Sequence, residues 1–278
     1  MSQPAASPLL PTIAFIGGGN MASAIIGGLI HQGHPASQIE VVEPWAEARE
    51  ALRKNYGIEA QAEAGPALQR AQIVVWAVKP QTFRDAAAPA KAHTQGALHL
   101  SVAAGIRSDS IAQWLGTERI VRTMPNTPAL VGKGMSALYA RPAVSAPERQ
   151  SIEAIMATTG EFLWVDSEPQ LDAVTALSGS GPAYVFYFLE AMTRAGTGMG
   201  LTEQQAHQLA VGTFVGASEL ARRSDDPPSV LRQRVTSKGG TTYAALQSME
   251  AAGVAASFEA AMRAAQHRAH ELGDEFGA

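Results

Sequence analysis

The segment from Thr12 to Leu29, TIAFIGGGNMASAIIGGL, constrains the fold more than any other part of the chain. It opens with an apolar run at 13–16, which is typical of a buried parallel strand because such a strand is covered on both faces. Gly17–Gly19 follow at once, and a helical pattern begins at Asn20. A strand, a glycine turn and a helix in this order predict a dinucleotide-binding unit, because glycines admit a tight turn and the close approach of a pyrophosphate.

A carboxylate at the end of the next predicted strand supports this interpretation. Glu43 lies 21 residues after Ala22, directly behind the apolar run at 39–42. An acid at this place can accept hydrogen bonds from the ribose hydroxyls of a dinucleotide. On the glycines alone, a tight strand–helix turn without a nucleotide remains an alternative.

Composition excludes several classes of protein. The 278 residues suffice for two domains, and the absence of cysteine excludes disulfides and thiolate catalysis. A formal net charge of -4 argues against a nucleic-acid partner, and the seven histidines show no metal-ligand spacing. Residues 1–11 have no basic segment or long apolar core, so we expect a flexible tail and no signal peptide. Since no apolar run reaches membrane-spanning length, we expect a cytoplasmic protein without a membrane partner.

The pattern divides the chain into two predicted domains. Between 12 and 165, apolar runs alternate with helical patterns, which predicts an α/β Rossmann-like domain with a doubly wound parallel sheet. We expect strands at 13–16, 39–43, near Ile58, and at 73–78, 98–102, 120–124, 135–139 and 161–165. From 166 to 278 only helical patterns occur, which predicts an all-α domain.

Two predictions concern helices in these domains. The segment Pro182–Met199 is apolar nearly all round, and such a helix must be buried. Because a domain of about 110 residues cannot easily cover it alone, we expect a helical subunit interface. A central helix in a monomeric bundle is the alternative. We also expect Ser108 and Ser180 to cap the helices that follow them.

Small residues and prolines at the predicted strand ends indicate where a ligand could lie. They occur at Ala77–Pro80, at Val102–Ala104 and at Met124–Pro128, although ordinary turns use such residues as well. Ligands of open parallel sheets bind beyond the carboxyl ends of the strands. These segments are therefore candidates to line a dinucleotide.

A second candidate site is the loop Thr236–Thr242, TSKGGTT, which precedes a predicted helix. Free N–H groups and hydroxyls at the positive end of a helix favour an anion, and a carboxylate is the guest we expect. The alternative is simple capping of the helix by Thr241. Spacing marks out no acid–base pair, which suits hydride transfer to an already protonated imine.

Five motifs, in order, resemble the pyrroline-5-carboxylate reductase family: GGGNMA after the first strand, AVKP, RTMPNTP, ALSGSGPAY and VTSKGGTTYAAL. The resemblance extends from about residue 12 to 272. It implies reduction of L-1-pyrroline-5-carboxylate to L-proline by NADPH or NADH, the final step of proline biosynthesis. It also implies a homodimer formed by the helical domains, and often a ring of dimers.

The resemblance further implies roles for individual residues. The pyrophosphate is expected at Ile16, Gly17, Gly18, Gly19, Asn20 and Met21, the adenosine ribose at Glu43, and the nicotinamide near Ala77, Val78, Lys79, Pro80, Val102, Ala103, Ala104 and Asn126. The substrate carboxylate is expected at Ser237, Gly239, Gly240, Thr241 and Thr242, with Thr242 also near the ring nitrogen as the catalytic candidate. Asp225 matches an acidic position that some relatives have near the proline site, and this match is weaker than the others.

Two residues depart from the family pattern. Lys238 stands where many relatives have proline, and Glu43 stands where many have a small hydroxyl residue, so that an acid would face a 2′-phosphate. Competing interpretations are another imine or β-hydroxyacid reductase and a non-catalytic binding protein. The hydroxyacid enzymes rely on a lysine in the long interdomain helix, and Pro182–Met199 contains none.

Overall fold

A computed structural model of the chain describes residues 11–277, so the predicted flexible tail lies, apart from Pro11, outside the described residues. The described chain forms two compact units. The first unit comprises the described residues up to Ser180 and those from Ala265 onward, and the second unit comprises Gly181–Ala264. Helix α11 (Val254–Phe276) therefore begins in the second unit and ends in the first.

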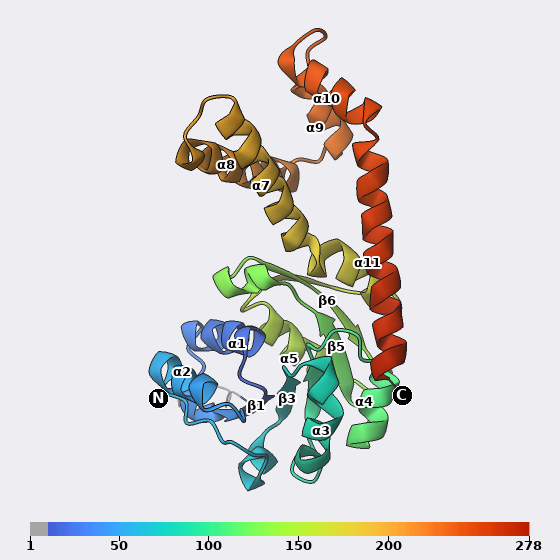
Figure 1. Cartoon of the computed structure of the whole chain (residues 1–278). Coiled ribbons are helices and arrows are strands. Elements are labelled where there is room, and N and C mark those ends of the chain that lie inside the picture. Colours follow the sequence, from blue (N-terminus) through green and yellow to red (C-terminus); the bar gives the residue numbers. More distant parts are fainter. Residues whose placement is uncertain (1–10, 278) are drawn as a thin grey trace, which may run out of the picture. The chain divides into compact units, whose positions relative to one another are not determined.

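The first unit is built on a seven-stranded sheet in the order β2-β1-β3-β4-β5-β6-β7 (Figure 1). The strands are β1 (Ile13–Ile16), β2 (Ile39–Val42), β3 (Ile73–Trp76), β4 (Leu98–Ser101), β5 (Ile120–Met124), β6 (Gly134–Ala140) and β7 (Gly160–Trp164). Strands β1 to β5 are parallel, and β1 lies between β2 and β3. The doubly wound, mostly parallel sheet is confirmed, and its strand order changes direction beside β1.

Strand β6 is the exception, because it pairs with β5 antiparallel. The connection between them spans only residues 125–133 and holds the 3₁₀ turn η3 (Thr127–Val131). A parallel crossover needs about a dozen residues or more, so a connection this short forces the chain to turn back. The connection from β6 to β7 is longer and contains α5 (Ala146–Met156). Strand β7 pairs parallel with β6.

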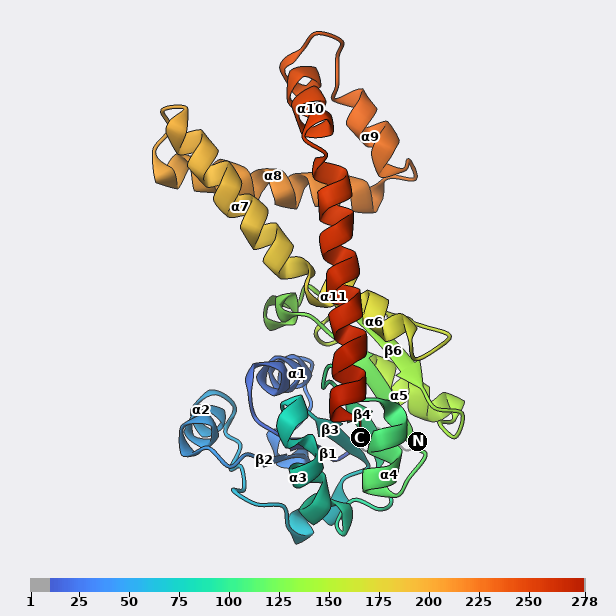
Figure 2. The same ribbon diagram turned by 45° about the vertical axis from the view of Figure 1, so that its right-hand side comes forward.

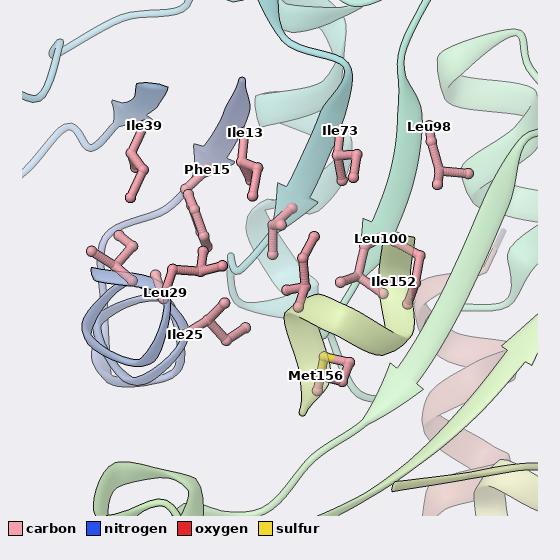
Figure 3. Packing of buried hydrophobic residues seen from close by; sticks show 14 of the residues in the cluster. Ile13, Phe15, Ile25, Leu29, Ile39, Ile73, Leu98, Leu100, Ile152 and Met156 are labelled. Atoms are coloured by element: carbon pink, nitrogen blue, oxygen red, sulfur yellow. The ribbon is translucent and has the colours of Figure 1, made fainter. Parts of the chain in front are cut away.

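Helices cover both faces of the sheet. On one face lie α1 (Asn20–His31), α2 (Ala46–Tyr56) and α5, whose apolar side chains join the cluster drawn in Figure 3. On the other face lie α3 (Pro80–Lys91) and α4 (Ser108–Leu115) with the 3₁₀ turn η2 (Pro66–Arg70); a further 3₁₀ turn, η1 (Ala36–Gln38), precedes β2. Each strand from β1 to β4 is buried along its whole length, as continuous apolar runs predict.

The predicted strand near Ile58 is wrong. Ile58 is buried in the core, but its segment only passes the edge of the sheet and makes one bridge, between Gln61 and Val42. Ile58 lies between the exposed residues Gly57 and Glu59, and one buried residue does not sustain a ladder.

The prediction that Ser108 caps a helix is also wrong. Arg107 is the residue before α4, and Ser108 is already inside the helix. The Ser108 N–H and hydroxyl donate to the two carboxylate oxygens of Glu168, at 2.5 and 2.7 Å. Glu168 also accepts from Arg122 of β5 at 2.7 Å. A carboxylate from a distant part of the chain thus satisfies the helix start.

Ser180 is likewise not the cap of the long apolar helix. Its backbone is helical, and its N–H donates to the carbonyl of Thr175 at 2.8 Å. The chain passes from α6 (Gln170–Val174) through a π-helical turn, η4 (Thr175–Gly179), into α7 (Gly181–Gly198) without a separate start. π-Helical turns within helices are rare and concentrate at functional sites.

The end of α11 packs closely within the first unit. A side chain at Gly105 would lie 2.9 Å from Cβ of Leu272, and one at Gly273 would lie 2.6 Å from the guanidinium of Arg107. Arg107 also pairs with Asp172 at 3.2 Å. Nη2 of Arg107 also donates to Nδ1 of His270 in α11 at 2.9 Å. The close contacts at the two glycines and this hydrogen bond therefore hold the last turns of the chain on this unit.

The second unit contains only helices: α7, α8 (Glu203–Arg223), α9 (Pro228–Arg234), α10 (Thr241–Ala251) and the first part of α11 (Figure 2). The all-α prediction is confirmed, because no strand follows β7 within the described residues, although the short α6 and α9 were not predicted. Thr202 and Gln205 form a capping box at the start of α8. Within residues 11–277, no helix combines the length and the apolar character that crossing a bilayer requires.

This unit buries almost nothing by itself. Of residues 181–264, only Gly196, Ala206 and Ala210 are buried. Large side chains of α7 remain exposed, among them Phe186 at 57% and Tyr187 at 65%. A set of helices without a core must gain its stability from another surface.

One buried histidine makes the stability of the first unit depend on pH. The indole of Trp76 donates to Nδ1 of His99 at 3.0 Å, and both side chains are buried. Burial lowers the pKa of His99 from 6.5 to about 4, and a hydrogen bond to the backbone of Thr94 only partly opposes this. His99 is therefore neutral in the folded protein over a range in which the unfolded chain protonates it.

We predict that His99→Gln flattens the acid limb of the stability curve. In the parent, His99 binds a proton below pH 6.5 in the unfolded state but stays neutral in the folded state. The free energy of unfolding therefore falls by about 3 kcal/mol as the pH is lowered toward 4. Glutamine retains an acceptor for Trp76 and does not titrate. Urea unfolding at several values of pH measures the difference; equal pH slopes for parent and variant would show that His99 is not the titrating group.

Candidate functional site

The first glycine turn is fixed at the point where the strand order changes direction. Gly17 has φ +97°, and its N–H donates to the carbonyl of Val42 in β2 at 2.8 Å. A side chain here would lie 2.5 Å from the carbonyl oxygen of Ala77, directly behind β3. Only glycine fits both the backbone angle and the contact, so the turn lies tightly between the ends of β2 and β3.

Gly19, two residues later, is exposed and faces open space. A side chain built at this position meets no atom within 4 Å. It precedes α1, whose first N–H groups have no acceptor within the helix. An uncrowded helix start at the carboxyl edge of a parallel sheet fits a pyrophosphate, and the predicted residues 16–21 lie together there.

Glu43 is attached to this turn by its side chain. Its carboxylate, in a residue only 5% exposed, accepts from the Gly18 N–H at 2.7 Å and from the Trp45 N–H at 2.9 Å. The sequence placed Glu43 at the end of β2 but did not indicate these bonds. The carboxylate holds the glycine turn and the start of α2 together, in addition to any contact with a ribose.

The other residues predicted for the cofactor lie along the same edge. Ala77 and Val78 follow β3, and Lys79 and Pro80 begin α3, with Pro80 in the first turn. Val102–Ala104 follow β4, where the N–H of Ala103 is held by the Ser101 hydroxyl at 3.3 Å. The parallel register of β1, β3 and β4 brings these three strand ends side by side.

Asn126, the last residue predicted for this site, braces the edge. Its amide donates to the carbonyl of Ser178 at 3.1 Å and accepts from the Met135 N–H at 3.0 Å. Nearby, a side chain at Gly179 would lie 2.4 Å from Cε of Met124. The motifs RTMPNTP and ALSGSGPAY therefore meet within the first unit, which their distance in the sequence does not reveal.

The second candidate loop lies in the second unit, between α9 and α10. Gly239 has φ +76°, and the N–H of Gly240 donates to the carbonyl of Ser237 at 3.0 Å. The Ser237 hydroxyl lies 2.7 Å from where a side chain at Gly240 would begin. The loop is therefore a compact turn in which the backbone angle favours glycine at Gly239, and Gly240 lies close to Ser237.

Thr241 does not cap this helix. Gly240 is the N-cap residue, it makes no side-chain cap bond, and Thr241 is the first helical residue. The Ala244 N–H donates to the carbonyl of the N-cap residue Gly240 at 3.1 Å. The N–H groups of the preceding turn, at Thr241 and Thr242, lack helical acceptors and lie in exposed residues.

Asp225 and Lys238 are both exposed, and Asp225 lies apart in the sequence, in the connection between α8 and α9. Its neighbour Asp226, for which the sequence indicates no role, pairs with Arg234 at 2.6 Å. Since Arg234 ends α9, this ion pair ties the two ends of that helix to each other. Among residues 11–277, no cluster of three or more metal-ligating side chains occurs.

Two family models match the chain. Residues 12–105 match a model described as NADP oxidoreductase, coenzyme F420-dependent, and residues 168–272 match one described as pyrroline-5-carboxylate reductase dimerisation. A curated protein of Pseudomonas aeruginosa, named pyrroline-5-carboxylate reductase, is 45% identical over 96% of this chain and 98% of its own.

Solved structures agree with these matches. A pyrroline-5-carboxylate reductase from Coxiella burnetii has a TM-score of 0.88 and 36% identity, covering 95% of this chain and 98% of its own. A pyrroline carboxylate reductase from Plasmodium falciparum, solved with NADP bound, has a TM-score of 0.85 and 27% identity, again covering 95% and 98%.

We predict that Gly19→Ala separates ligand binding from folding. A methyl group at this open position meets no protein atom, so the melting temperature should stay within about 2 °C of the parent. The same methyl group would stand where a pyrophosphate must approach, so affinity for a dinucleotide should fall about tenfold or more. Fluorescence titration measures the affinity, and unchanged binding would place the pyrophosphate elsewhere.

Proposed function

The chain belongs to the pyrroline-5-carboxylate reductase family, and we propose that it reduces the C=N bond of L-1-pyrroline-5-carboxylate with NAD(P)H, giving L-proline. The observation that carries this proposal is a pair of anion cradles, the turn before α1 and the turn before α10. The first suits the pyrophosphate of the cofactor, and the second suits the carboxylate of the substrate.

The residues of the first unit fit the cofactor. The backbone of residues 16–21 holds the pyrophosphate at the start of α1, where Gly19 leaves room for it. The segments Ala77–Pro80 and Val102–Ala104 at the ends of β3 and β4 consist of small or apolar residues apart from Lys79, and they lie against the nicotinamide. Asn126 holds this edge by its bonds to Ser178 and Met135. When bound, NAD(P)H supplies the hydride, and these residues orient its ring and exclude water.

The loop Ser237–Thr242 binds the substrate carboxylate. The N–H groups of Thr241 and Thr242 can donate to it at the positive end of α10 without a nearby arginine. Ser237 adds a hydroxyl. Lys238 is exposed and adds positive charge to this loop. Fixing the carboxylate orients the ring so that the imine carbon can meet the hydride.

Proton supply places little demand on the protein. A cyclic imine is protonated readily, and the protonated form accepts hydride directly. The Thr242 hydroxyl donates a hydrogen bond to the ring nitrogen or to a water beside it, which orients the ring. Asp225 supplies an exposed negative charge that favours the protonated imine.

The helices of the second unit form the dimer contact. Their exposed apolar side chains and nearly absent core require a covering surface, and a second copy of the chain supplies it. The family model for dimerisation falls on residues 168–272, which supports this assembly. We propose a homodimer that further associates into a ring of dimers, with a dinucleotide-binding domain at 12–165 and a substrate-binding, dimerising domain at 166–278.

Oxidation of NAD(P)H with and without L-1-pyrroline-5-carboxylate tests the proposed function. We expect rapid oxidation that depends on this substrate and yields L-proline. Activity on an open-chain imine or a β-hydroxyacid in its place would favour another reductase of this fold. The absence of a lysine from α7 speaks against the hydroxyacid reaction.

Thr241→Pro tests the carboxylate cradle. Gly240 has ψ 177°, which a following proline tolerates, and the first turn of a helix accepts proline without strain. The variant deletes one N–H donor, so inhibition by L-proline should weaken about tenfold while NAD(P)H affinity stays unchanged. If proline inhibits the variant as strongly as the parent, the carboxylate is held elsewhere.

Thr242→Ala should slow the reaction without abolishing it. The lost hydroxyl orients the ring and is not an obligatory acid, so we expect kcat/KM to fall about ten- to a hundredfold. Steady-state kinetics measure the loss, and the Kd of NAD(P)H serves as the control. Complete inactivity with intact proline binding would make Thr242 the proton donor.

The smallest active species should be a dimer. Light scattering coupled to size exclusion, run at assay concentration, measures the mass of the active fraction. Phe186→Asp puts a charge on the exposed apolar face of α7 and should shift the protein toward inactive monomers. A fully active monomer of the parent would show that the helices are not buried between two chains.

A further inference from the structure

Arg49 occupies a distinctive position at the end of β2. Its Nη1 donates to the backbone carbonyls of Glu43, at 2.9 Å, and of Pro44, at 2.7 Å. These two bonds anchor the guanidinium beside the residues that follow the strand. A guanidinium carries five N–H donors on three nitrogens, so Nη2 and Nε remain to bind a ligand.

Arg49 also lacks a carboxylate partner among the described residues, unlike the next arginine of the same helix. Arg53, one turn later, is paired with Glu50 at 2.7 Å. A half-buried arginine that is fixed by backbone carbonyls alone retains its full positive charge for an anion. Arg53 therefore serves as a matched control on the same helix.

The position is that of the cofactor's adenosine end. Through Glu43, the start of α2 is bonded to Gly18 of the phosphate turn, at 2.7 Å. In a dinucleotide-binding sheet, an acid after the second strand binds the ribose 2′-hydroxyl, whereas an arginine nearby accommodates a 2′-phosphate. This chain carries both kinds of residue.

Trp45 lies between them in the sequence. Its N–H is held by the Glu43 carboxylate at 2.9 Å, while its side chain is 72% exposed. The backbone of Trp45 is therefore held in place, while its indole is exposed at the start of a helix. Such an indole offers a flat apolar face on which a purine can stack. The same carboxylate thus holds the phosphate turn and this aromatic ring in register.

Resting on the proposed function, we propose that Arg49 binds the 2′-phosphate of NADPH and that Trp45 stacks on its adenine, so that this chain accepts NADPH although Glu43 follows β2. The carboxylate of Glu43 accepts hydrogen bonds from two backbone N–H groups, which offset part of its negative charge and weaken its repulsion of a phosphate. The donors of Arg49 that are left unbonded attract that phosphate. NADH loses only the contact with Arg49 and keeps the others.

Two nucleotide fragments test this without any turnover. Calorimetry would give the Kd of 2′,5′-ADP and of 5′-ADP for the full-length parent and for Arg49→Gln, Arg49→Lys, Arg53→Gln and Trp45→Ala. A charge-assisted contact is typically worth at least about a tenfold change in affinity. We expect Arg49→Gln to weaken 2′,5′-ADP about tenfold or more and 5′-ADP less than about twofold, while Arg49→Lys restores part of the preference.

The controls decide between this account and its alternatives. Arg53→Gln should change neither Kd, and Trp45→Ala should weaken both fragments by a similar factor. Equal loss of both fragments in Arg49→Gln, or no loss, would overturn the assignment of Arg49; unchanged binding in Trp45→Ala would overturn that of the indole. If the fragments behave as expected but pyrroline-5-carboxylate is not reduced, the proposed function fails while this site stands.

Discussion

The contact between Gly17 and the carbonyl of Ala77 is the constraint on which the site depends. A side chain at Gly17 would lie 2.5 Å from that oxygen, and φ is +97°. Any other residue would add backbone strain of about 1–3 kcal/mol to a direct clash. Because the contact joins the turn after β1 to the end of β3, it fixes how closely these two strand ends lie together.

Carboxylates and amides then hold this edge in place. Glu43 bonds Gly18 and Trp45, Asn126 bonds Ser178 and Met135, and Glu168 bonds Ser108 and Arg122. In each case one side chain satisfies groups from separate parts of the chain. Such groups contribute to function by preorganisation, since a ligand then meets donors that are already oriented.

The second unit follows a different principle. It contains the compact loop between α9 and α10 but buries only a glycine and two alanines within residues 181–264. Its exposed apolar side chains need a covering surface, so the folding of this unit is coupled to the assembly of the subunits. On the proposed function, the loop before α10 binds the substrate, so substrate binding depends on a second copy of the chain through the stability of the helices that carry the loop.

Much of the fold could be predicted from the sequence, because buried strands and glycine turns are local signals. The order and type of β1, β3 and β5, and the all-α second part, follow from such runs. The antiparallel direction of β6 can also be predicted from the sequence, because the connection at 125–133 is too short for a parallel crossover. The strand expected near Ile58 failed because burial of one residue does not imply pairing.

The side-chain partners could not be predicted. Ser108 and Ser180 have the sequence context of caps, yet one bonds Glu168 and the other continues a π-helical turn. Glu43 was located by spacing, but its two backbone donors depend on how β2 and the glycine turn meet in space. Long-range hydrogen bonds of this kind leave no periodic signal in the sequence.

Deuterium transfer distinguishes hydride reduction of the imine from any other reaction of this protein. The full-length protein would be given pyrroline-5-carboxylate and NAD(P)H deuterated at the transferable position of the nicotinamide, and the proline would be analysed by NMR and mass spectrometry. We expect one deuterium in each L-proline, on the ring carbon that was the imine carbon. Proline without the label, or cofactor oxidation without proline, would contradict it.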